Sequence, residues 1–63
     1  MLHLAEITEI HENDAYFDTG IVNPGEVILW IERKTNDGIE CGQALRKNGH
    51  KAIFCAIKTR RLN

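Results

Sequence analysis

Three histidines and two cysteines are the side chains of this 63-residue chain best suited to bind a metal ion or act as nucleophiles. They are His3, His11, Cys41, His50 and Cys55. Structural zinc sites use closely spaced pairs of cysteine or histidine ligands. The spacing Cys41-x8-His50-x4-Cys55 contains no such pair and matches no zinc signature. We therefore expect no metal and no cofactor, and we interpret both cysteines as small core residues.

Nucleophilic catalysis would need His50 beside one of the cysteines and a third group that orients its imidazole ring. The sequence indicates neither this third group nor a glycine-rich phosphate loop, since Asn-Pro-Gly at residues 23–25 is an ordinary turn. The carboxylates of residues 6–18 are spread over positions expected to face solvent. A core this small also leaves little room for a substrate pocket. We therefore expect a protein that is not an enzyme and has no small-molecule substrate.

Aromatic and cationic side chains offer a different chemistry, that of binding. If a helix covers one face of a sheet, the opposite face carries Phe17, Ile28, Trp30, Phe54, Lys58 and Arg60. Tryptophan, phenylalanine and arginine are enriched at the centres of protein interfaces, so these six residues are the predicted partner-binding set. A second interpretation is that the aromatic residues form a shared core, with the N-terminal strand curling over them.

The charges divide sharply along the chain. Residues 1–32 carry seven acidic residues and no lysine or arginine, whereas residues 33–63 carry eight basic residues against Asp37 and Glu40. Such asymmetry can mark a nucleic-acid or membrane surface. It can equally mean that the two halves pack together and their charges interleave, because position along a chain is not position on a surface.

A single-stranded RNA or DNA binder is the alternative function. It would stack bases on the aromatic face and contact phosphates with the basic half, through Arg46, Lys47, Lys51, Lys58, Arg60 and Arg61. The formal net charge of −1 provides no long-range attraction to nucleic acid, however. The protein-binding function is therefore preferred.

The element that must position these residues is the segment 26–33, which contains the longest apolar run and the only tryptophan. Branched and aromatic residues favour a packed strand, and five apolar residues are far too few to span a bilayer. Successive side chains of a strand alternate between its faces. Val27, Leu29 and Ile31 then point one way, and Ile28 and Trp30 point the other. Both sets are apolar, so each face of this strand needs a cover.

Three other strands and two turns are predicted from alternation and turn chemistry. The strands cover residues 2–11, 15–22 and 51–60, with turns at residues 12–14 and 23–25. Proline followed by glycine suits a type II turn, and we expect it to join the strands 15–22 and 26–33 as a hairpin.

The segment 38–48 is predicted to be a helix. Asp37 and Glu40 resemble a capping box, the residues that follow have high helix propensity, and Gly49 can end a helix in the left-handed conformation. The resulting fold class is α+β, in the order β-β-β-α-β, with one helix on one face of an antiparallel sheet. In the alternative, Asn48-Gly49 is a hairpin turn and the protein is a five-stranded small β-barrel.

The length indicates one domain, residues 1–63, that buries only about 60% of its unfolded surface. Self-association is a common remedy for such marginal stability. No export signal is visible at the N-terminus, so a cytoplasmic location with reduced cysteines is expected. We expect an interaction module of phage-like accessory type that self-associates or binds a larger protein as a regulator or inhibitor.

Overall fold

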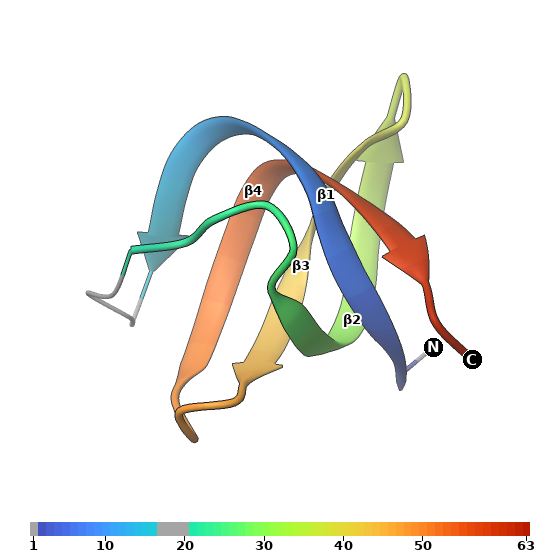
Figure 1. The fold of residues 1–63 in the computed structure, drawn as a ribbon. Coiled ribbons are helices and arrows are strands. Elements are labelled where there is room, and N and C mark those ends of the chain that lie inside the picture. The colour runs from blue at the N-terminus through green and yellow to red at the C-terminus, as the bar shows by residue number, and fades with distance from the viewer. Residues whose placement is uncertain (1, 17–20) are drawn as a thin grey trace.

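The computed structural model describes the backbone of residues 2–16 and 21–63 and the side chains of residues 2–11 and 21–63. Four antiparallel strands form a closed barrel (Figure 1). They are β1 (Leu2–Tyr16), β2 (Val27–Asn36), β3 (Ile39–Arg46) and β4 (Lys51–Arg61). Each strand pairs with the next one, and β1 also pairs with β4.

Strand β2 confirms the prediction of a strand around Trp30 and extends three residues beyond its predicted end. Ile28 and Trp30 are buried inside the barrel. Val27, Leu29 and Ile31 lie on its outside and are only partly buried. The interior of a barrel is filled by alternate side chains of every strand. The barrel therefore covers one apolar face of β2 and leaves the other outside.

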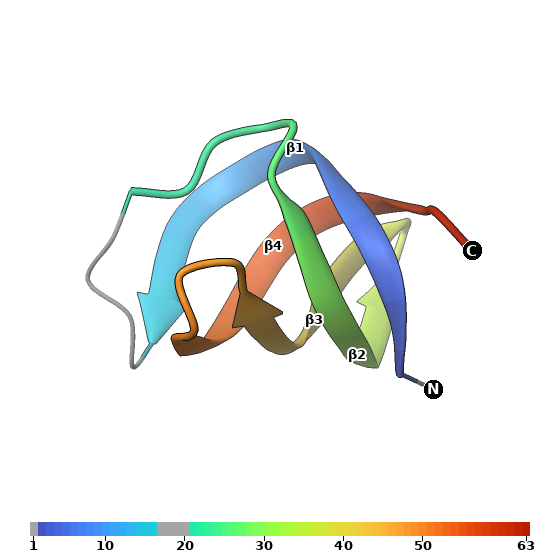
Figure 2. The same cartoon turned by 60° about the horizontal axis from the view of Figure 1, so that its bottom comes forward.

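Strand β1 is much longer than predicted and curves over β4 (Figure 2). The predicted turn at residues 12–14 is wrong, because Asp14 pairs with Cys55 and the strand continues to Tyr16. Shifts of register between Ile7 and Glu9 and between Ile10 and Asp14 interrupt the ladder. Such bulges bend a strand, so the polar residues mark a bend and not a reversal of the chain.

The turn at residues 23–25 is confirmed, but it does not close the predicted hairpin. The Glu26 N–H donates to the Asn23 carbonyl oxygen over 3.3 Å, and Gly25 has a φ of +96°, as a type II turn requires. The segment then pairs with β1, because the Ile7 N–H donates to the Glu26 carbonyl oxygen over 2.9 Å. Of the predicted strand 15–22, residues 15 and 16 belong to β1, residues 17–20 lie outside the described residues, and Ile21 and Val22 are not in a strand.

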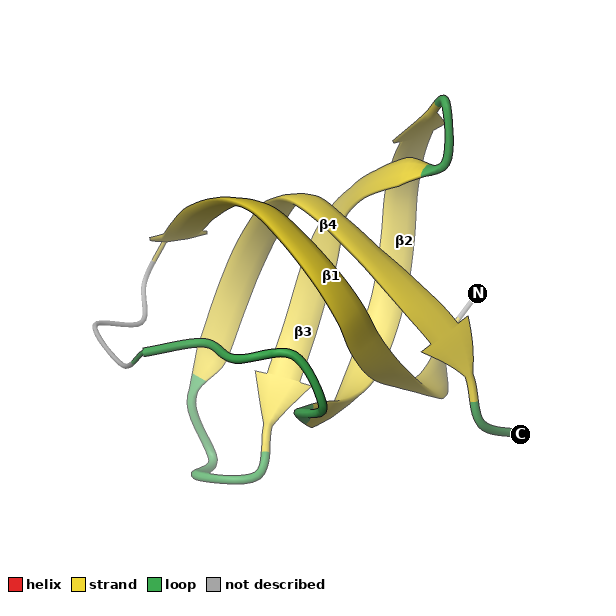
Figure 3. Ribbon diagram, turned by 45° about the horizontal axis from the view of Figure 1, so that its top comes forward, coloured by secondary structure: helices red, strands yellow, loops and turns green. Residues whose placement is uncertain are grey.

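The predicted helix over residues 38–48 is wrong, and with it the α+β class: the described part of the chain is all-β (Figure 3). Asp37 and Gly38 have φ values of 54° and 80°, and Asn36 pairs with Ile39 across them. Positive φ at both central residues defines the two-residue hairpin turn that Asp-Gly favours. Alternate residues of β3 are then buried, namely Glu40, Gly42, Ala44 and Arg46.

A second tight turn joins β3 to β4 at Asn48 and Gly49, as the barrel alternative required, although the barrel has four strands and not five. The Gly49 N–H donates to the Arg46 carbonyl oxygen and the Arg46 N–H to that of His50, both over 2.9 Å. Gly49 has a φ of +85°. Gly49, predicted to end a helix in the left-handed conformation, lies instead in the hairpin turn between two strands.

Strand β4 begins where predicted and ends one residue later, but its faces change partway along. Phe54 pairs with Gly42, whereas Ile57 pairs with Glu40, so β4 contains one extra residue between these pairs. Ala56 has a φ of +61° within this bulge. As a result Phe54 and Ile57 both face the core, although strict alternation would place them on opposite faces.

The core combines apolar side chains with one hydrogen-bonded carboxylate. Trp30 and Phe54 stack with ring centroids 6.4 Å apart. The buried Glu40 carboxylate accepts the Trp30 Nε1–H over 3.2 Å, and the Thr59 N–H and hydroxyl over 2.7 Å each. The core consists of Ala5, Ile7, Val22, Ile28, Trp30, Ala44, Ala52, Phe54 and Ile57. Within the described residues, no helix is long and apolar enough to cross a membrane.

Replacing Glu40 with alanine tests this network. The change leaves the buried Trp30 Nε1–H and the part-buried Thr59 N–H without their acceptor, so we expect the free energy of unfolding to fall by about 3 kcal/mol. Urea denaturation measures it. Glu32→Ala is the matched control, because Glu32 is exposed, and its effect should stay within about 0.5 kcal/mol. Equal losses in the two variants would show that the network does not stabilise the barrel.

Candidate protein-binding surface

Apolar side chains from all four strands meet on the outside of the barrel. Strand pairing places Leu2 beside Ile31, Leu4 beside Leu29, and Leu29 beside Leu45. Gln43 lies between Ile31 on β2 and Ile53 on β4. We call this surface the outer apolar face and define it by Leu2, Leu4, Leu29, Ile31, Leu45 and Ile53.

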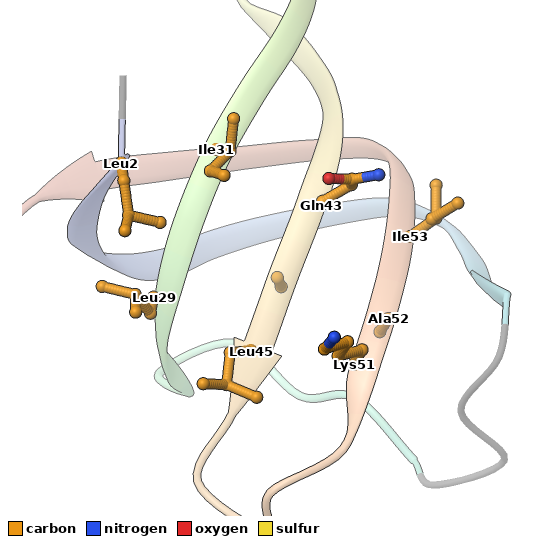
Figure 4. Close-up of a pocket in the computed structure, with 9 residues that line it drawn as sticks. Leu2, Leu29, Ile31, Gln43, Leu45, Lys51, Ala52 and Ile53 are labelled. Carbon is orange, nitrogen blue, oxygen red and sulfur yellow. The ribbon is translucent and has the colours of Figure 1, made fainter.

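The outer apolar face is open to solvent and hollowed. Leu2, Leu4 and Leu45 expose 54%, 41% and 42% of their surface. A depression of about 420 Å³ lies between the side chains (Figure 4). It is lined by Leu2, Leu29, Ile31, Gln43, Ala44, Leu45, Lys51, Ala52 and Ile53. Single exposed leucines are normal on a protein surface, but a contiguous group is typical of an interaction site.

Polar groups lie at the margins and near the centre of this face. Lys51 pairs with Leu45 at the β4 margin and forms no ion pair with any described residue. At the β1 margin, Glu6 follows Leu4 on the same side of the strand and forms an ion pair with Arg60. The Gln43 side-chain oxygen accepts a hydrogen bond from Arg33 Nη2 over 3.3 Å. The β4 margin therefore carries a cation without an ion pair among the described residues, and the β1 margin carries a carboxylate that is paired with Arg60.

The predicted partner-binding set does not share an exposed face. Ile28, Trp30 and Phe54 are at most 1% exposed and form the centre of the core. Lys58 and Arg60 lie on the surface in ion pairs with Glu9 and Glu6, and Phe17 lies outside the described residues. The aromatic residues thus occupy the shared core that was the second interpretation, and the opposite face of β2 is the one that is open.

The alternative nucleic-acid set is also divided. Arg46 is buried, and its guanidinium donates to both oxygens of Glu26 over 2.5 and 2.7 Å and to the Ile21 carbonyl oxygen over 2.9 Å. Lys58 and Arg60 pair with acidic residues of β1. The remaining members, Lys47, Lys51 and Arg61, are exposed. The acidic and basic halves of the chain therefore interleave across the β1–β4 pairing.

The two cysteines lie together on another part of the surface. Both are half-buried cysteines outside any disulfide, and they line a cavity of about 320 Å³ together with Lys34, Asn36, Asp37, Ile39 and Ala56. The interpretation of both cysteines as small core residues is wrong, because they are only half-buried and do not belong to the core, and Cys41 lies on β3 and not on a helix. Among the described residues, no three histidine, cysteine or carboxylate side chains converge as a metal-binding group.

Sequence reasoning missed Leu2, Leu4 and Leu45 as surface residues. The available signal was the apolar character of both faces of residues 27–31, which required a second cover. The prediction gave that role to a helix over 38–48, which is in fact a strand of the same barrel. Searches for similar proteins, made with family models, curated proteins and solved structures, returned no match to this chain.

The openness of this face can be tested with Leu45→Gln. Because Leu45 is 42% exposed, we expect the free energy of unfolding to change by less than about 1 kcal/mol, and retention on a hydrophobic-interaction column to fall. Ile28→Gln is the contrasting variant, since Ile28 is 1% exposed and an unpaired amide there should unfold the barrel. A Leu45→Gln protein as unstable as Ile28→Gln would show that the face is covered within the chain.

Proposed function

We propose that this protein is a non-enzymatic interaction module that binds a protein partner through its outer apolar face. The observation that carries the proposal is the contiguous group of exposed leucine and isoleucine side chains around one depression. Covering such a surface removes apolar area from water, which is the main driving force of protein association. A regulator or inhibitor of a larger protein would need little more than such a surface.

The closed barrel favours face-on binding over strand addition. In strand addition a peptide pairs with the free edge of a sheet. Here β1 pairs with β4 as well as with β2, and closure of a barrel removes sheet edges. A partner would therefore contact side chains on the outside of all four strands, where the apolar groups lie.

Single-stranded nucleic acid binding has less support. Bases would need exposed aromatic rings to stack on, but Trp30 and Phe54 are core residues. Phosphates would need basic groups that are not already neutralised, but Arg46, Lys58 and Arg60 are paired with carboxylates. We also propose a cytoplasmic location, a reducing compartment in which cysteines outside disulfides, such as Cys41 and Cys55, stay reduced.

Site-specific photo-crosslinking in the producing cell tests this function. A benzophenone amino acid placed at Leu45 should form covalent adducts with protein when the cells are irradiated. The same amino acid at Ile21 is the matched control, because Ile21 is also a large apolar residue, 77% exposed, and does not line the depression. We expect adducts at Leu45 that protease destroys and nuclease leaves intact.

Two results would contradict the proposal. Equal adducts at Leu45 and Ile21 would show that any exposed apolar position is captured. Adducts that nuclease removes would favour the nucleic-acid alternative.

A further inference from the structure

We propose that the outer apolar face binds a second copy of this chain, forming a two-fold symmetric dimer. This inference rests on the proposed function and names the partner. In a symmetric dimer the same patch serves both subunits, so it must be complementary to itself in shape and in charge. The outer apolar face meets both conditions.

Complementary shapes lie side by side on this face. Leu2 and Leu45 are its most exposed apolar side chains, and both stand at the rim of the depression that Ile31 and Ile53 also line (Figure 4). A face that carries projecting leucines beside a hollow can dock against its own copy. Each leucine then enters the partner's depression, and the contact occurs twice.

The strand order fixes a simple geometry for this docking. Two faces that meet by two-fold rotation share an axis lying in the plane of the interface. An axis parallel to the strands, between β2 and β3, places β2 over β3 of the partner and β4 over β1 of the partner. Leu29 and Leu45, which are neighbours within one chain, then also meet between chains.

Charge complementarity follows from the same axis. Lys51 lies at the β4 margin, level with Leu45, Leu29 and Leu4, and Glu6 lies one step along β1 from Leu4. That step is two residues, or about 7 Å along a strand, which a lysine side chain can reach. The rotation therefore brings Lys51 of each copy to the Glu6–Arg60 pair of the other, where the Glu6 carboxylate can accept hydrogen bonds from both cations. If both margins carried charges of the same sign, the two copies would repel each other.

The molecule is large enough for such an interface. A standard interface takes about 800 Å² from each partner, about one fifth of the 4138 Å² that this chain exposes. The dimer would also bury the second apolar side of β2, which the barrel leaves outside.

Charge-exchange variants test the dimer and its axis together. Lys51→Glu alone places two acidic groups at each contact, and Glu6→Lys alone places two basic groups there. Each homodimer should dissociate at least about 100-fold more readily than the wild type. An equimolar mixture of the two variants restores opposite charges at both contacts, so it should form a heterodimer. Sedimentation velocity over a range of concentrations measures each state.

Matched controls come from the surface beside the other cavity. Lys34→Glu and Glu32→Lys make the same exchanges at exposed positions outside the outer apolar face. We expect both to leave the wild-type dimer unchanged. Urea denaturation of Glu6→Lys shows whether losing the ion pair with Arg60 affects folding.

The possible outcomes separate this inference from the proposed function. A wild type that stays monomeric at about 100 µM overturns the dimer; if the probe at Leu45 still captures a different protein, the proposed function stands. A monomeric wild type whose probe at Leu45 forms no protein adduct overturns both the dimer and the proposed function. If the wild type is a dimer but the mixture of the two charge variants forms no heterodimer, the inferred axis and contacts are overturned.

Discussion

The structure depends on one constraint: a strand that is apolar on both faces lies in a chain able to cover only one of them. The barrel encloses Ile28 and Trp30 completely. It does so by placing Leu29 and Ile31 on the outside, because neighbouring residues of a strand point to opposite faces. The outer apolar face is thus a direct consequence of packing Trp30 inside the barrel. The proposed function is the binding of a protein partner to this face.

Buried polar groups in this small barrel are paired in specific ways. Glu40 accepts hydrogen bonds from Trp30 and Thr59, which ties β2, β3 and β4 together around the indole. Arg46, at the other end of β3, is buried against Glu26. Gly42 lies between them, and a Cβ there would come within 2.2 Å of the Ile31 carbonyl oxygen. The same Cβ would come within 3.0 Å of the Trp30 indole, so glycine at this position leaves room both for β2 and for the indole.

The sequence allowed the strands β2 and β4 to be predicted, together with the turn at Pro24 and Gly25, because each depends on local pattern. It did not reveal β3. The inward positions of that strand carry Glu40, Gly42 and Arg46, so its two faces show no contrast in hydrophobicity and helix propensity prevailed. Asp37-Gly38 was the stronger signal, since this dipeptide favours a two-residue hairpin.

The predicted partner-binding set does not coincide with the candidate site. The expectation of a partner followed from the two apolar faces, but the choice of the aromatic face rested on the predicted helix. Once residues 39–46 join the barrel as a strand, the aromatic face becomes the interior. The bulge at Ala56, which turns Ile57 inward, was also beyond prediction, because alanine gives no sequence signal for a positive φ.

Methyl NMR with a soluble paramagnetic probe tests the central claim most directly, because it reports which side chains contact solvent. In dilute protein the account predicts strong broadening of the Leu2 and Leu45 methyl signals and none for Ile28 and Ile57. At high concentration it predicts that the leucine signals become protected while the signal of Ile21 remains broadened. Leucine signals that are protected even in dilute protein, or that broaden equally at every concentration, would contradict an open face that a second copy covers.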